Sequence, residues 1–347
     1  MKFIHTLIMM VPSLLLAQLN GPEAVDHDPD TDLYYISNKS GGNILVGPAG
    51  GPYSVFTSNV SSPHGIEVVA DTVYVCDGSA IKAFQIPSGA LVNTYNIAGA
   101  TFLNGLTSDR VGMLWFTDFS NSRLHSLDLT TGDDEVLVAN TGTTPNGVIY
   151  DPVILRLIIV NWGSNAPILA YNLWSNILTT VVFNSGLNNC DGIAIGCDDQ
   201  FYVSSWGAGA IHTFSNNFFT GPTLFVSGLA QPSDIHYNLD ADTLVSPNFG
   251  SSTVTYHEET CLSTGYEEVQ RPKINIWPNP GNGSILLDQA TNGVVQVVDN
   301  SGRLILTTEI AGNELDLTSL PNGQYILTID QEGEELPFRT IYLKTSN

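Results

Sequence analysis

Short apolar runs separated by polar turns recur along most of this chain. Six similar segments begin at residues 22, 63, 103, 145, 190 and 232, which are 41, 40, 42, 45 and 42 positions apart by subtraction. Each start is followed by a second and usually a third apolar run, such as LYYISN and then NILVG in the first segment. Four short strands in a repeat of about 42 residues are typical of a β-propeller blade. The pattern therefore predicts an all-β protein with a six-bladed propeller over residues 21–262.

The last repeat has no clear fourth apolar run, so its outer strand either comes from residues 261–269 or is absent. The pattern changes after residue 272. Residues 274–347 alternate strand-like runs with Asn-Gly and Ser-Gly turns, as in VVQVVDNSGRLI and SLPNGQYILTID. Such turns connect antiparallel strands, which predicts a small Ig-like β-sandwich after a linker at residues 263–273.

The first residues have the pattern of an export signal. Lys2 precedes an apolar run from Ile4 to Leu16, and Ala17 ends it. The run is too short to span the roughly 30 Å hydrocarbon core of a membrane, so residues 1–17 are predicted to be a cleaved signal peptide. No later stretch is long and apolar enough to span, which predicts no transmembrane segment after cleavage.

Charge narrows the range of partners. The chain has 11 Lys and Arg against 34 Asp and Glu, a net charge of −23. This charge repels phosphate backbones, so nucleic-acid binding is excluded. The four cysteines show no metal-binding spacing and are interpreted mainly as small buried apolar residues.

Two sets of polar residues are predicted to lie at one mouth of the propeller channel. In an antiparallel blade, the start of the innermost strand and the end of the second strand lie at the same end. The first set, the channel ring, consists of Glu23, His64, Asn104, Asn146, Asp191 and Ser233. The second set, the outer ring, consists of Asn38, Asp77, Asp118, Asn161, Ser205 and Asn248.

Neither ring contains Lys or Arg. Carboxylate and amide oxygens without a counter-charge are the ligands that calcium prefers, and Glu23, Asn104, Asn146 and Asp191 would supply two of each. The alternative is that these polar residues are only turn chemistry around a water-filled channel, because Asn-Gly and Asp-Gly are common turn dipeptides.

The propeller resembles the gluconolactonase, regucalcin and paraoxonase family of six-bladed propellers. Glu23, Asn104, Pro145-Asn146-Gly147 and Asp191-Gly192 match four family positions that bind a channel calcium. Residues 62–66, SPHGI, resemble the paraoxonase segment whose His belongs to a catalytic dyad. The resemblance implies a calcium-dependent hydrolase of a lactone or ester, with Asp191 or His64 as the base that activates water.

Two positions depart from the family pattern. Asp77 stands where paraoxonases have the second His of the dyad, so a His64–Asp77 pair is the remaining way to orient the imidazole. Phe102 stands where gluconolactonases have an Arg, which argues against a sugar-acid lactone. Four aromatic residues that follow the outer ring, Phe119, Trp162, Trp206 and Phe249, are interpreted as packing between blades, with a ligand platform as the alternative.

Residues 274–347 resemble the C-terminal sorting domain of the type IX secretion system. The matching pieces are Trp277-Pro278-Asn279-Pro280, the DNSGRLI turn, Pro321-Asn322-Gly323-Gln324-Tyr325 and the last strand, which ends at Lys344. The resemblance implies handling by the type IX machinery and export through the periplasm of a Bacteroidota-type bacterium, to the medium or the cell surface. The function that competes with a hydrolase is a non-catalytic propeller that binds a ligand or protein partner, since propellers host many functions.

Overall fold

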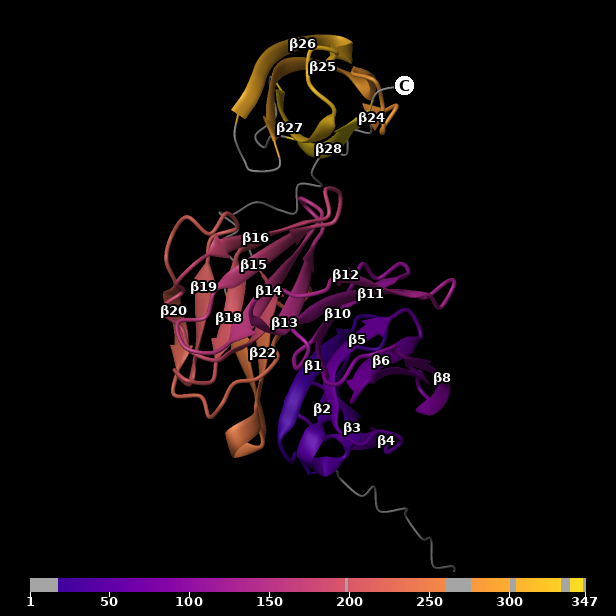
Figure 1. Ribbon diagram of the computed structural model, residues 1–347, viewed down its shortest axis with the longest axis vertical. Coiled ribbons are helices and arrows are strands. Elements are labelled where there is room, and N and C mark those ends of the chain that lie inside the picture. Colours follow the sequence, from indigo (N-terminus) through magenta and orange to yellow (C-terminus); the bar gives the residue numbers. More distant parts are fainter. Residues whose placement is uncertain (1–17, 197–198, 260–275, 300–303, 332–337, 346–347) are drawn as a thin grey trace, which may run out of the picture. The chain divides into compact units, whose positions relative to one another are not determined.

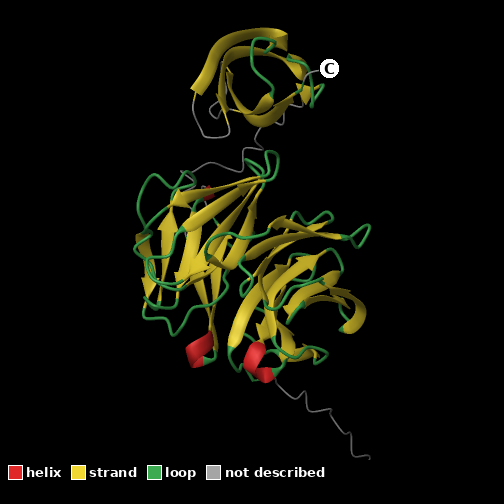
Figure 2. Ribbon diagram, in the orientation of Figure 1, coloured by secondary structure: helices red, strands yellow, loops and turns green. Residues whose placement is uncertain are grey.

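The computed structural model describes residues 18–196, 199–259, 276–299, 304–331 and 338–345. Strands dominate, and the two short 3-10 helices η1 (Lys39–Gly41) and η3 (Phe249–Ser251) are drawn in red in Figure 2. The predicted signal peptide and linker lie outside the described residues. Within those residues, no helix is long and apolar enough to cross a membrane.

Residues 22–258 form six antiparallel sheets, each built from strands that are consecutive in the sequence (Figure 1). Blade one contains β1 (Pro22–Asp28), β2 (Leu33–Asn38), β3 (Asn43–Gly47) and β4 (Ser54–Thr57). Blade two contains β5 (Pro63–Val69), β6 (Thr72–Asp77), β7 (Ala80–Gln85) and β8 (Ala90–Asn96). Blade three contains β9 (Leu103–Ser108), β10 (Met113–Asp118), β11 (Arg123–Asp128) and β12 (Asp134–Val138).

Blade four contains β13 (Thr144–Asp151), β14 (Arg156–Trp162), β15 (Ile168–Asn172) and β16 (Ile177–Val182). Blade five contains β17 (Cys190–Ile195), β18 (Phe201–Ser205), β19 (Ala210–Phe214) and β20 (Thr223–Ser227). Blade six contains β21 (His236–Asn238), β22 (Thr243–Asn248) and β23 (Thr253–Glu258). The propeller predicted from the repeat is confirmed. A fourth strand for blade six would fall outside the described residues.

The innermost strands of blades one, two, three and five are irregular where they carry their channel-ring residue. The pairing of β1 with β2 shifts between Pro22 and Ala24, and that of β5 with β6 shifts between Pro63 and Ile66. The same shift occurs between Cys190 and Ile193 in blade five. A bulge re-aims the side chain that it contains. The ring residues are therefore placed by a repeated backbone feature.

Gly105 and Gly147, which follow ring residues, lie inside strands rather than in turns. A Cβ on Gly105 would lie 2.4 Å from the carbonyl oxygen of Asn146, and a Cβ on Gly147 would lie 2.4 Å from that of Asp191. Real Cβ contacts are never this short, so only glycine allows the innermost strands of adjacent blades to approach so closely. The Asn-Gly and Asp-Gly dipeptides are therefore explained by packing of strands around the channel, and not by turns.

The core lies between the faces of neighbouring blades. Ile158 and Val160 of blade four pack with Ile193 and Val203 of blade five, all at most 2% exposed. Such interdigitating apolar faces supply most of the free energy of folding. The acidic turn between β1 and β2 needs no ion, because Asp28 accepts hydrogen bonds from the Asp30 N–H and the Thr31 hydroxyl.

The ring closes where blade six meets blade one, and β22 lies beside β1 (Figure 1). No strand of the described residues is shared between these two blades. Hydrogen bonds close this seam instead. They join the Asp234 N–H to the Glu23 carbonyl at 2.9 Å, the Tyr53 and Tyr256 hydroxyls at 2.9 Å, and the Asn238 amide to the Tyr34 hydroxyl at 2.7 Å.

The C-terminal domain contains β24 (Ile276–Trp277), β25 (Ser284–Asp299), β26 (Leu304–Asp316), β27 (Gly323–Gln331) and β28 (Phe338–Lys344). The predicted sandwich takes the form of one sheet whose long strands curl over their own core, partly like a barrel (Figure 1). Lys344 is buried, and its ammonium donates to the carbonyl oxygens of Leu317, Thr318 and Leu320. This contact fastens β28 to the segment that precedes β27.

Candidate functional site

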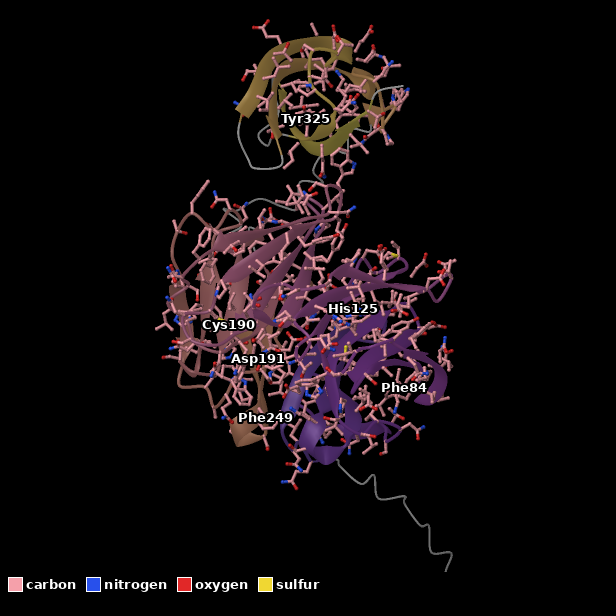
Figure 3. The ribbon with its side chains drawn as sticks, in the orientation of Figure 1. Phe84, His125, Cys190, Asp191, Phe249 and Tyr325 are labelled. Atoms are coloured by element: carbon pink, nitrogen blue, oxygen red, sulfur yellow. The ribbon has the colours of Figure 1, made fainter. Side chains whose placement is uncertain are left out.

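The channel ring is buried at the inner end of the blades. Glu23 and Asp191 are each 4% exposed, Asn146 1% and Asn104 8%. Figure 3 shows Asp191 between the blades, close to the middle of the propeller. The four predicted metal ligands lie on the innermost strands of four different blades.

Hydrogen bonds connect these ligands in chain order. The Asn104 amide donates to the Asn146 side-chain oxygen, and the Asn146 amide nitrogen lies 3.2 Å from the Cys190 carbonyl oxygen, to which it donates. Asn146 also forms a side-chain hydrogen bond with Asp191. In contrast, Glu23 Oε2 is buried without a hydrogen-bond partner among the described residues.

The carboxyl groups at this site are hard to ionise. Burial raises the pKa of Glu23 to about 7, although Lys39 acts in the opposite direction. Burial, followed by the charges of Glu23 and Asp234, raises the pKa of Asp191 well above its usual range. Burial also raises the pKa of Asp234, which lies beside Glu23. Burial is the first cause of all three shifts, and Lys39 offsets it only in part for Glu23 and Asp191.

A hard divalent cation is the group that these residues would hold. No three His, Cys, Asp or Glu side chains of the described residues converge into a metal centre, so a cation here depends on the two amides. Two carboxylates and two amides are oxygen donors suited to calcium. The unpartnered Glu23 oxygen and the unbalanced charge are what a divalent cation would satisfy. The donor set therefore fits.

Lys39 is a residue of this site that the sequence rings did not include. Its ammonium lies 3.9 Å from Glu23 Oε1 and 5.5 Å from the centre of the Phe249 ring. The signal was present in the sequence, because Lys39 directly follows the outer-ring residue Asn38. The two rings contain no Lys or Arg, but Lys39 adds a positive charge at the mouth of the channel.

His64 has the geometry of a neutral hydrogen-bond acceptor. Its Nδ1 lies 2.8 Å from the Ser62 carbonyl oxygen, which fixes the proton on Nδ1, and Nε2 is buried without a partner among the described residues. Burial, with a further effect of Lys39, lowers the pKa of His64 to about 4. The imidazole is therefore uncharged at neutral pH.

The predicted His64–Asp77 hydrogen bond is not formed. Asp77 instead accepts from the N–H groups of Ser61 and Ser62 at 2.7–3.1 Å, and pairs with the Lys82 ammonium at 2.7 Å. Burial acts to raise the pKa of Asp77, but these hydrogen bonds outweigh it and lower the pKa. Asp77 thus fastens the loop that leads into β5, and a backbone carbonyl orients His64.

Other outer-ring residues fasten the equivalent loops. Asp118 accepts from the N–H groups of Thr101 and Phe102 at 3.1 and 3.2 Å, before β9. Asn38 accepts from the N–H of Asn20 at 2.6 Å, before β1. Asp77, Asp118 and Asn38 of the outer ring are therefore structural, although the side-chain oxygens of Asn161 and Asn248 are buried without a partner among the described residues.

We expect Asp77→Ala to lower the free energy of unfolding by about 2 kcal/mol, because the N–H groups of Ser61 and Ser62 and the Lys82 ammonium lose their partner. Any hydrolytic kcat/KM should stay within about threefold of the parent at temperatures where the variant is folded. Urea denaturation and steady-state kinetics measure the two effects. The exposed Asp133→Ala is the control. If stability is unchanged and kcat/KM falls a hundredfold, the result supports a catalytic role for Asp77.

A chain of aromatic contacts surrounds the same mouth. We call Phe102, Phe119, Trp162, Trp206 and Phe249 the aromatic belt. Successive members contact each other at ring-centroid distances of 5.3–6.3 Å, and His64 packs on Phe102 at 4.7 Å. Phe119, Trp162, Trp206 and Phe249 contact one another across neighbouring blades, as predicted for these four. Each belt residue is also partly exposed. The belt is therefore accessible, whereas the ring beneath it is not.

A second charged cluster, which the repeat does not predict, joins residues from several blades. Asp26 is buried and contacts His236 Nδ1 at 2.8 Å, Arg110 at 3.4 Å and the Val68 N–H at 2.6 Å. Burial acts to raise the pKa of Asp26, but His236 and Arg110 outweigh it and lower the pKa. This cluster ties blade six to blades one, two and three.

The C-terminal domain matches a known family. Residues 275–341 match the family described as "Secretion system C-terminal sorting domain". This match confirms the interpretation of residues 274–347 as a sorting domain of the type IX system. A comparison with curated protein sequences finds no match.

Solved structures confirm the propeller fold. A gluconolactonase from Xanthomonas campestris has a TM-score of 0.60 at 16% identity, over 69% of this chain and 86% of that protein. Virginiamycin B lyase from Staphylococcus aureus has a TM-score of 0.52 at 15% identity, over 70% and 96%. An auxiliary nutrient binding protein from Bacteroides thetaiotaomicron has a TM-score of 0.57 at 13% identity, over 70% of both chains. Because the three proteins differ in activity, the likeness establishes the fold alone.

Proposed function

We propose that this protein is an exported, calcium-dependent hydrolase of a lactone or ester. The observation that carries the proposal is the buried convergence of Glu23, Asn104, Asn146 and Asp191, with Glu23 Oε2 left unpartnered. These four residues would hold the calcium. When bound, calcium would polarise a carbonyl oxygen and stabilise the negative charge that develops on it.

A side chain of this protein would accept the proton from the attacking water. His64 has its Nδ1 proton bonded to Ser62, so Nε2 presents a lone pair without another partner among the described residues. Asp191 is the other candidate base, as in the gluconolactonase pattern. Either group would take a proton from water that attacks the carbonyl carbon. The bond to the leaving alkoxide then breaks, and the alkoxide recovers a proton.

The sorting domain supports an activity outside the cytoplasm. Residues 275–341 belong to the part of the chain that the type IX machinery would recognise. The product is therefore expected in the medium or on the cell surface of a Bacteroidota-type bacterium.

A non-catalytic binding propeller remains the second candidate, and one observation favours it. No carboxylate forms a hydrogen bond with His64 among the described residues, and its pKa of about 4 makes the imidazole a weak base. The fold is also shared with a nutrient binding protein.

The test is the calcium content and turnover of the full exported chain. We expect about one calcium per chain after dialysis against calcium-free buffer. We also expect saturable hydrolysis of a lactone or aryl ester that a chelator abolishes and added calcium restores. Bound calcium without turnover across a broad panel favours the binding propeller. No calcium, even after reloading, contradicts the metal site.

A further inference from the structure

Lys39 occupies a position where the other blades carry different residues. The residue directly after each outer-ring position is Lys39 in blade one and Gly78 in blade two. In blades three to six it is Phe119, Trp162, Trp206 and Phe249. In blades three to six, an aromatic ring at this position packs against the neighbouring blade. A lysine in the same place therefore calls for a reason other than packing.

The Lys39 ammonium lies at the mouth near Glu23 but does not form a hydrogen bond with it. Its distance of 3.9 Å from Glu23 Oε1 is too long for a hydrogen bond, so the carboxylate attracts the ammonium without using its N–H groups. The Phe249 ring steadies it through a cation–π contact at 5.5 Å. The Lys39 side chain is 31% exposed, so the charge is within reach of a solute.

A filled cation site would leave Lys39 as the unbalanced charge at this mouth; this step rests on the proposed function. A divalent cation balances the carboxylates of Glu23 and Asp191. A third carboxyl group, Asp234, accepts hydrogen bonds from the N–H groups of Ile193 and Ile235. Lys39 then loses its attraction to Glu23 and is free to turn toward a negatively charged group on a ligand.

The belt beside Lys39 accepts the rest of such a ligand. Trp162, Trp206 and Phe249 contact each other in sequence and are partly exposed. Phe102 extends this surface to His64. Planar apolar groups stack on such rings.

We propose that Lys39 is a specificity-determining residue, which selects substrates that carry a carboxylate on a flat apolar body. The belt contacts the flat body, and the Lys39 ammonium pairs with the carboxylate. The carbonyl group to be hydrolysed lies over the channel ring. Neutral analogues of the same shape are poorer ligands.

The test uses two matched pairs of probes on the full, calcium-loaded chain. The ligands 4-hydroxybenzoate and 4-hydroxybenzamide differ in charge and hardly in shape, and quenching of tryptophan fluorescence measures their Kd. The esters 4-acetoxybenzoate and 4-acetoxybenzamide report kcat/KM for the same pair of groups. The variants are Lys39→Met, which removes the charge, and Lys39→Arg, which keeps it. Trp206→Leu controls for the belt.

We expect the parent to bind the carboxylate about tenfold more tightly than the amide, because one charge-assisted contact is added. Lys39→Met should abolish this preference and leave the amide Kd within twofold, and Lys39→Arg should restore it. Trp206→Leu should weaken both ligands alike. Equal binding of the two ligands, binding of neither, or a preference that survives Lys39→Met overturns the proposal.

The outcomes separate this inference from the proposed function. A Lys39-dependent preference in binding, with neither these esters nor the broad panel of lactones and esters hydrolysed, supports Lys39 as the selecting residue and removes the hydrolase. Hydrolysis of both esters at equal kcat/KM, unchanged in Lys39→Met, keeps the hydrolase and removes the role of Lys39.

Discussion

Asp191→Asn is expected to abolish hydrolysis while the propeller stays folded. Asp191 is a candidate calcium ligand and one of two candidate bases, so its loss should lower kcat by about 10²–10⁴-fold. The substitution keeps the shape and hydrogen-bonding capacity of the side chain, and it removes a buried carboxyl whose pKa burial raises. We therefore expect equal or higher thermal stability without calcium. Steady-state kinetics, calcium titration and thermal unfolding measure these effects.

Two comparisons make this result specific. Asp134→Asn, on the exposed outermost strand of blade three, should leave activity and calcium affinity unchanged. His64→Gln separates the two candidate bases, because it removes the imidazole without removing a calcium ligand. If Asp191→Asn hydrolyses as fast as the parent, Asp191 has no place in the mechanism.

Without calcium, the chain should lose stability as the pH rises, and Glu23 should be a main cause. The pKa of Glu23 is raised from 4.5 in the unfolded chain to about 7 in the folded one. Between these values the folded protein keeps a proton that the unfolded chain has lost, so the free energy of unfolding falls with increasing pH. The full loss, about 3 kcal/mol for this group, is reached above pH 7.

Glu23→Gln should therefore be more stable than the calcium-free parent at pH 8 by up to about 3 kcal/mol, and equally stable at pH 4. Calcium at a hundred times its Kd should stabilise the parent by about 2.7 kcal/mol and leave this variant unaffected. His64, whose pKa is lowered, acts in the opposite direction between about pH 4 and 6.5. Comparing variant and parent at each pH removes that contribution.

Urea denaturation across this pH range, with and without calcium, measures both effects. Glu135→Gln, on the exposed surface of β12, is the control. A calcium-free parent whose stability does not depend on Glu23 would contradict the raised pKa. Calcium stabilisation that persists in Glu23→Gln would place the cation elsewhere.

The sequence predicted the blades and the channel ring because both are periodic. Apolar runs and a polar residue recur in each repeat, so the position of Asp191 on one side of the channel follows from that of Glu23 by symmetry. The glycine after several ring residues is also evident in the sequence, but the reason why glycine is required there is not. The short distance between Gly147 and the Asp191 carbonyl exists only once neighbouring blades are packed.

The remaining contacts of the site are not periodic, so the repeat gave no guide to them. Asp77 was predicted from its place in the repeat to orient His64, but its partners are backbone N–H groups in a loop. Lys39 was left out because the rings were defined by strand ends, and it stands one residue beyond. Asp26, Arg110 and His236 come from three blades and meet only in the folded ring.

The seam between blades six and one also determines when the channel can exist. Its hydrogen bonds join residues separated by about two hundred positions, such as Gly21 with Ser252 and Tyr53 with Tyr256. Contacts so distant in the sequence form late and slowly, because the loop between them must first become ordered. Glu23 reaches the other ring residues only at this last step. A chain that is exported before its seam closes would therefore cross the cell envelope without the proposed calcium site, and would assemble it where folding is completed.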